Sequence, residues 1–197
     1  MSSPRRFSTL GGHPALDLAN TVTWRLDPGR RRDYVSTYAE ALRCLEQLGV
    51  LTSAERTVVE RQATRSPELA AFELEELKRL REAVYGVVVD DSDAADELSR
   101  HFADAIAAAT LTRGDGALRW SLPADVRLPR LRMAQLAIDL VTENPSDRLR
   151  QCDDDACGWV FLDRSPRRNR RWCDSADCGN RNRVRAHYER ERSSASS

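Results

Sequence analysis

The chain has 197 residues, of which 41% are hydrophobic and 31% are charged, and its 31 basic side chains balance 31 acidic ones. This length allows one domain of roughly 150 residues with its own core, plus a small appendage. Because the charges balance, a uniformly basic nucleic-acid-binding surface is excluded, and any such function must depend on a local cluster.

The N-terminus favours a reducing compartment. Met1 to Arg6 lead into no apolar segment, so the pattern of a secretory signal peptide is missing, and no stretch of the chain has the composition of a membrane span. We therefore expect a cytoplasmic protein without membrane contact, in which disulfides are disfavoured.

A first amphipathic helix is predicted over residues 34–48. Apolar side chains recur with helical spacing at Leu42 and Leu45, and Gly49 follows as a residue that readily takes the left-handed conformation ending many helices. Cys44 lies beside this apolar face. It is either a small buried hydrophobe or, as the alternative, a redox-sensing thiol.

Capping signals place further helices. Thr52 and Glu55 are spaced as a capping box, which begins a second helix, and Ser66–Pro67 begins a long third one. Helices over about 92–109 and 131–143 follow. The side chains expected to face the core on the third and fourth helices are Leu69, Phe72, Leu77, Leu80, Val84, Leu98, Phe102, Ile106 and Ala109.

The fold class predicted from these patterns is mainly α. Residues 118–122 are the only strand expected before the cysteine-rich region. We expect a helical N-terminal domain over 1–146, a small treble-clef-like finger made of a β-hairpin and a helix over 147–192, and a disordered tail over 193–197.

Four cysteines in the last quarter of the chain have the spacing of a metal site. They form two Cys-x4-Cys pairs separated by fifteen residues, and two such pairs can surround one tetrahedral zinc ion. Four thiolates leave no open position for water, so the zinc is predicted to be structural. The apolar run 159–162 favours a hairpin between the pairs, and a helix follows the second pair. The predicted ligands are Cys152, Cys157, Cys173 and Cys178.

Disulfides and an iron–sulfur cluster are the competing interpretations of these cysteines. A reducing compartment disfavours disulfides, and iron–sulfur sites more often use tighter or differently grouped cysteines. One structural Zn²⁺ is the cofactor that the spacing favours.

The cysteine-rich segment resembles a known bacterial family. Residues 171–181 read Arg-Trp-Cys-Asp-Ser-Ala-Asp-Cys-Gly-Asn-Arg, and with 152–163 upstream they resemble the CGNR zinc finger, named for its Cys-Gly-Asn-Arg tetrapeptide. Residues 11–22, Gly-Gly-His-Pro-Ala-Leu-Asp-Leu-Ala-Asn-Thr-Val, resemble the start of the helical ABATE domain that usually precedes this finger. The two resemblances imply a stress-induced transcriptional regulator whose finger binds DNA.

Positive charge is concentrated in the finger. Residues 164–192 contain ten arginines and four acidic residues, a net charge of +6, whereas residues 1–150 contain 21 basic and 23 acidic groups. Arginine binds phosphates as a planar fork and reads guanine in the major groove. The side chains expected to bind double-stranded DNA are Arg167, Arg168, Arg170 and Arg171 in the loop and Arg181, Arg185, Tyr188 and Arg192 on one stripe of the helix.

The sequence is compatible with two other functions of the finger. A zinc module that docks a protein partner is the alternative, and an inert structural finger is the third possibility. The sequence contains no Ser-His-Asp order, nucleotide-binding glycine loop or paired-carboxylate signature, so we expect no enzymatic activity.

A polar cluster near the N-terminus suggests a second site. Asp17, Asn20 and Thr21 have the spacing of one helix face, and Arg25 follows one turn later. Such a set predicts either a site for a small anionic or polar effector or a buried capping network. A homodimer is also expected, because one finger with few base-reading side chains is marginal for a unique genomic site.

Overall fold

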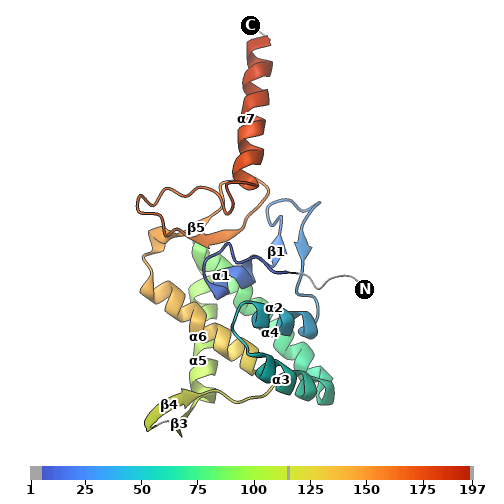
Figure 1. Ribbon diagram of the computed structural model, residues 1–197, viewed down its shortest axis with the longest axis vertical. Helices are drawn as coiled ribbons and strands as arrows, with labels where there is room; N and C mark the ends of the chain where they lie inside the picture. The colour runs from blue at the N-terminus through green and yellow to red at the C-terminus, as the bar shows by residue number, and fades with distance from the viewer. Residues whose placement is uncertain (1–5, 115, 196–197) are drawn as a thin grey trace.

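The computed structural model describes residues 6–114 and 116–195, and in this part of the chain the fold is mainly helical (Figure 1). The helices are α1 (Pro14–Ala19), α2 (Tyr38–Gln47), α3 (Ser53–Arg65), α4 (Pro67–Val88), α5 (Ala94–Ala108), α6 (Leu128–Glu143) and α7 (Cys178–Ala195), with a 3-10 turn at Ser146–Arg148. Three antiparallel hairpins pair β1 (Val22–Thr23) with β2 (Arg32–Asp33), β3 (Thr110–Gly114) with β4 (Ala117–Ser121), and β5 (Leu149–Gln151) with β6 (Val160–Leu162). The predicted fold class, a helical region followed by a small hairpin and a helix, is confirmed.

Local capping chemistry determines where several helices begin and end. The predicted capping box of Thr52 and Glu55 opens α3, and Gly49, with φ of 73°, follows the end of α2. Helix α2 begins four residues later than predicted, because Thr37 and Glu40 form a second capping box. None of the described helices combines the length and the apolar composition that crossing a membrane requires.

The core lies between α1, α2, α4, α5 and α6, and α1 is the most deeply enclosed of these helices. On α2, Cys44 is fully buried, and this burial raises the pKa of its thiol to about 12. A thiol in this environment stays protonated, so Cys44 acts as a small core side chain and not as a reactive one.

The apolar face predicted for α4 and α5 is only partly correct. Leu77, Leu80, Val84 and Leu98 are buried as expected, but Leu69, Phe72 and Ile106 are exposed. The first turns of α4 bury Glu73 instead, which receives a hydrogen bond of 2.7 Å from the buried guanidinium of Arg130 on α6. A hydrophobic pattern cannot predict a core position occupied by an ion pair.

An exposed apolar hairpin lies at the end of the molecule opposite α7 (Figure 1). The register of β3 and β4 places Leu111 opposite Trp120 and Arg113 opposite Leu118, so these four side chains share one face. All ten residues of the two strands are exposed. Only the second of the two strands was predicted from the sequence.

The β5–β6 hairpin of the finger belongs to the same core as the helices. Leu149, Val160 and Leu162 lie in the hydrophobic cluster that includes α1, α4 and α6. The side-chain amide of Asn20, just after α1, pairs with the backbone of Val160, accepting from its N–H at 2.8 Å and donating to its carbonyl at 2.9 Å. Strands β5 and β6 therefore pack as part of the helical body.

The helix of the finger, α7, stands clear of this body (Figure 1). It begins at Cys178 and continues to Ala195, so residues 193–195 of the expected tail are helical, and residues 196–197 lie outside the described part. Val184, which its position on the helix suggests as a packing residue, is exposed.

Replacing Asn20 tests the junction between α1 and β6. Asn20→Ala leaves a buried N–H and a buried carbonyl of Val160 without partners, so we expect the free energy of unfolding to fall by about 2–4 kcal/mol. Urea denaturation measures this change. Asn180→Ala, at an exposed position of α7, is the matched control and should shift the free energy by less than about 0.5 kcal/mol. Equal effects of the two substitutions would contradict the role given to Asn20.

Candidate metal centre and basic surface

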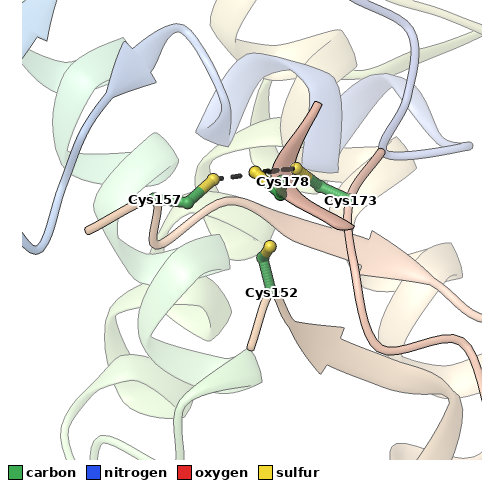
Figure 2. Close-up of side chains that lie close together, drawn as sticks. All are labelled: Cys152, Cys157, Cys173 and Cys178. Atoms are coloured by element: carbon green, nitrogen blue, oxygen red, sulfur yellow. Dashed lines mark hydrogen bonds between the residues drawn. The ribbon is translucent and has the colours of Figure 1, made fainter. Parts of the chain in front are cut away.

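The four predicted cysteine ligands converge on one point (Figure 2). Their sulfur atoms all lie within 4.8 Å of one another, with Sγ separations of 3.6 Å between Cys157 and Cys173 and 3.5 Å between Cys173 and Cys178. A tetrahedral zinc ion with Zn–S bonds of about 2.3 Å requires sulfur separations of roughly 3.8 Å. All four cysteines are buried and none forms a disulfide, so the donor set fits zinc.

The chain reaches this geometry through two aspartate turns. In the first pair the Asp154 carboxylate accepts from the N–H of Ala156 at 3.1 Å, and in the second the Asp174 carboxylate accepts from Ala176 at 2.8 Å. Each turn folds the four-residue gap back on itself, which explains why the gaps are wider than the common two. Strands β5 and β6 flank the first pair, whereas the sequence suggested a hairpin between the pairs.

Arg181 joins the metal centre to its surroundings. Its guanidinium donates to the Cys178 sulfur at 3.0 Å and to the carboxylate of Asp154 at 3.0 Å, and it lies 4.7 Å from the ring centroid of Trp24. A donor to a ligand sulfur orients the ligand and offsets the negative charge of the thiolate. These contacts favour a structural role over the DNA-binding role expected for Arg181.

Arg170 is also held inside the finger. Its guanidinium donates to the backbone carbonyls of Trp172 and Leu10, each at 3.0 Å, and lies over the Phe161 ring. The buried carboxylate of Asp163 accepts from the N–H groups of Ser165 and Arg170, which closes the loop on both sides. Arg170 therefore shapes the loop, and its expected DNA contact is not supported by this environment.

The other predicted DNA-binding side chains lie on the surface. Arg167 forms no ion pair among the described residues, and Arg168 and Arg171 pair with the exposed or half-exposed Asp147 and Asp153. The predicted side chains Arg185, Tyr188 and Arg192 are exposed on α7, and so are Arg183 and Arg190, which the single predicted stripe left out. Since the helix is solvated on most sides, one stripe underestimates its accessible surface.

Most of the polar cluster near the N-terminus is a capping network. Helix α1 ends at Ala19, so Thr21 and Arg25 do not continue the helix face expected for them. Thr21 donates to the Leu18 carbonyl at 2.7 Å, and Arg25 donates to Glu82 at 2.6 Å. With the pairing of Asn20 described above, three of the four side chains have internal partners that account for them.

Asp17 is the exception in this cluster. One oxygen of its carboxylate accepts from the Gly11 N–H at 2.8 Å, but it forms no ion pair among the described residues. Burial raises the pKa of Asp17 to about 6. Sequence reasoning singled out the residue but could not show that its neighbours leave it without a counter-charge.

These features define a class of protein: a helical domain whose core includes the hairpin of a four-cysteine zinc finger. Residues 148–191 match the family of the CGNR zinc finger, and residues 12–144 match the ABATE family, described as "Putative stress-induced transcription regulator". The chain belongs to this ABATE family, and its four cysteines are the zinc site of the CGNR finger. A comparison with curated proteins returned no match.

Zinc content should depend on the four cysteines as a set. Cys178→Ser removes the ligand at the start of α7, so we expect the purified variant to contain less than one equivalent of zinc. Elemental analysis measures this content. Because β5 and β6 share the core of the helices, the thermal midpoint of the helical signal should fall as well.

Cys44→Ala is the matched control for this substitution, because Cys44 is buried but lies on α2, outside the cluster. It should keep one zinc per chain. Retention of a full equivalent of zinc by Cys178→Ser would contradict the assignment.

The raised pKa of Asp17 predicts a stability that depends on pH. Between the usual pKa of 3.8 and about 6 the folded state binds more protons than the unfolded state, so stability falls as the pH rises through this window. Asp17→Asn keeps the acceptor for Gly11 and removes the charge. The variant should exceed the parent protein in unfolding free energy by up to about 3 kcal/mol at pH 8, and by less at pH 5.

Urea denaturation of both proteins at the two pH values measures this difference. The control, Asp90→Asn, replaces an exposed carboxylate and should change the free energy of unfolding by the same small amount at both pH values. A pH-independent effect of Asp17→Asn would show that the carboxylate is not destabilised by burial.

Proposed function

We propose that the protein regulates transcription by binding double-stranded DNA through α7 and the arginine loop of its zinc finger. One observation carries this proposal: α7 starts at a zinc ligand and projects from the body (Figure 1). A helix of 18 residues is about 27 Å long, and the major groove of B-DNA admits a helix. The surface of α7 is polar and contains five arginines and two glutamates.

The proposed DNA contacts come from the exposed arginines. On α7 these are Arg183, Arg185, Arg190 and Arg192, and in the loop they are Arg167, Arg168 and Arg171. The ion pair of Arg185 with Asp155 is largely solvated, with side chains 47% and 74% exposed. Exposed pairs contribute little to stability, so a phosphate can replace the carboxylate at small cost. Arg170 and Arg181 are left out because other groups of the protein already hold their guanidinium groups.

The zinc ion supplies structure in this proposal. Four cysteines occupy all positions of a tetrahedral ion, and two of them hold the turn between β5 and β6 against the first turn of α7. The metal thereby fixes the direction in which α7 leaves the body. Gly179 supports the same junction, because a Cβ at this position would lie 2.8 Å from the Trp172 ring.

Protein docking remains the second candidate function, and the surface favours a different location for it. The exposed apolar side chains Leu111, Leu118 and Trp120 lie on the β3–β4 hairpin, at the end opposite α7. An isolated two-stranded hairpin is marginally stable in water, and contiguous apolar surface is typical of protein contacts. The β3–β4 hairpin is therefore a better candidate than the zinc module for contact with a protein partner, or with the second copy in the expected homodimer.

The DNA proposal is tested by replacing Arg185, Arg190 and Arg192 together with Ala. Fluorescence anisotropy with a pool of random duplexes should show a loss of affinity of about tenfold or more at 100 mM salt. The slope of log affinity against log salt should become shallower by about two to three, because each lost phosphate contact removes roughly 0.9. Zinc content should not change.

The matched control replaces Arg43, Arg61 and Arg65, three exposed arginines on α2 and α3, and removes the same charge. It should bind the duplexes as the parent protein does. Equal losses of duplex affinity in both variants would show that only the net charge of the protein matters, which contradicts the proposed site. Absence of duplex binding by the parent protein at low salt would refute the proposal.

A further inference from the structure

A cavity lies beneath the N-terminal segment, beside the polar cluster of α1. Its volume is about 140 Å³. Its lining includes the side chains of Asp17, Thr23, Tyr34 and Trp159. The wall therefore combines a carboxylate, hydroxyl groups and aromatic rings.

The carboxylate in this cavity has no counter-charge. Asp17 is 5% exposed and forms no ion pair among the described residues, and the nearby Arg25 and Arg81 are committed to Glu82 and Asp33. An amide oxygen would serve equally well as the acceptor for the Gly11 N–H, so the fold itself does not require the negative charge. Arg6 also lines the cavity, but it is exposed and forms no ion pair with the described residues.

Two further groups specify the chemistry of an occupant. The Thr23 hydroxyl oxygen is buried and has no hydrogen-bond partner in the described part of the chain. The indole N–H of Trp159 donates to the Val22 carbonyl at 3.2 Å, which fixes the ring as part of the wall. A buried carboxylate, an unpaired hydroxyl and an aromatic ring together suit a cation that donates N–H hydrogen bonds.

We propose that this cavity binds a small organic cation bearing N–H donors, of the alkylammonium or guanidinium class, with Asp17 as the counter-charge and Thr23 as a second hydrogen-bond partner. This specifies the effector that the polar cluster of α1 was expected to bind, and it rests on the proposed function only for its regulatory consequence. The anionic effector that the sequence also allowed is disfavoured, because it would face an unneutralised carboxylate.

The site lies where it can affect the finger. Asn20 also lines the cavity and pairs with Val160 of β6, and Trp159 is two residues beyond the zinc ligand Cys157. Thr23 and Trp159 also line a second cavity, of about 260 Å³, whose wall includes Cys157 and Cys178. A cation bound at Asp17 therefore contacts the same side chains that border the metal centre.

The test uses the zinc-loaded full chain and two probes, methylguanidinium and n-propylammonium chloride, followed by amide chemical shifts in NMR titrations. At least one probe should saturate, with the largest shifts at Asp17, Thr23 and Trp159. Sodium acetate at the same concentrations should leave these signals unchanged. Asp17→Asn should weaken the binding of the cation by about tenfold or more, because a charge-assisted hydrogen bond is lost.

The control, Asp90→Asn, removes an exposed carboxylate and should bind the cation as the parent protein does. A second variant, Thr23→Val, leaves Asp17 intact and should also weaken binding of the cation. Unchanged affinity in Asp17→Asn, saturation by acetate, or failure of both cations to saturate would overturn the proposal. The titration contains no DNA, so its failure is independent of the duplex-binding result.

Discussion

The four-cysteine zinc site is the constraint on which the arrangement of the finger depends. Two of its ligands come from the turn between β5 and β6, one from the loop before α7 and one from the first residue of α7. The hydrophobic cluster that these segments share is small. The ion replaces the packing that a segment of this length cannot provide. Arg181 and the two aspartate turns then orient the ligands, and the direction of α7 follows from that geometry.

The zinc finger and the helical domain are coupled because they share a core. Asn20 pairs with β6, and β6 packs against α1 while β5 packs against α4. Packed side chains and one pair of hydrogen bonds therefore connect the surroundings of α1 to the hairpin that holds two of the zinc ligands. This connection gives the proposed effector cavity a direct physical route to the proposed DNA-binding helix.

Much of the fold and of the metal centre could be predicted from the sequence, because spacing alone encodes them. The two Cys-x4-Cys pairs, the capping box at Thr52 and the stop at Gly49 are local signals that tertiary context did not override. The failures share a different cause. Leu69 and Phe72 lie outside the face of α4 that is buried. That face includes Glu73, whose partner is the buried Arg130, and no periodicity reveals such a pair.

The arginines of the finger show the same limit of sequence reasoning. A helical wheel assigns Arg181 to an accessible stripe, but the Cys178 sulfur and Asp154, brought together only by folding, use its guanidinium. Asp17 was recognised as polar and clustered, yet its missing counter-charge depends on where Arg25 and Arg81 find their partners. Both outcomes are decided by contacts between residues far apart in the chain.

Hydrogen exchange of the zinc-loaded protein, compared with and without a bound duplex, shows which end of the molecule binds DNA. We expect added protection in α7 and in the loop over residues 164–171, with no change in the β3–β4 hairpin at the opposite end. Protection confined to the hairpin end, with α7 exchanging as in the free protein, would contradict this expectation.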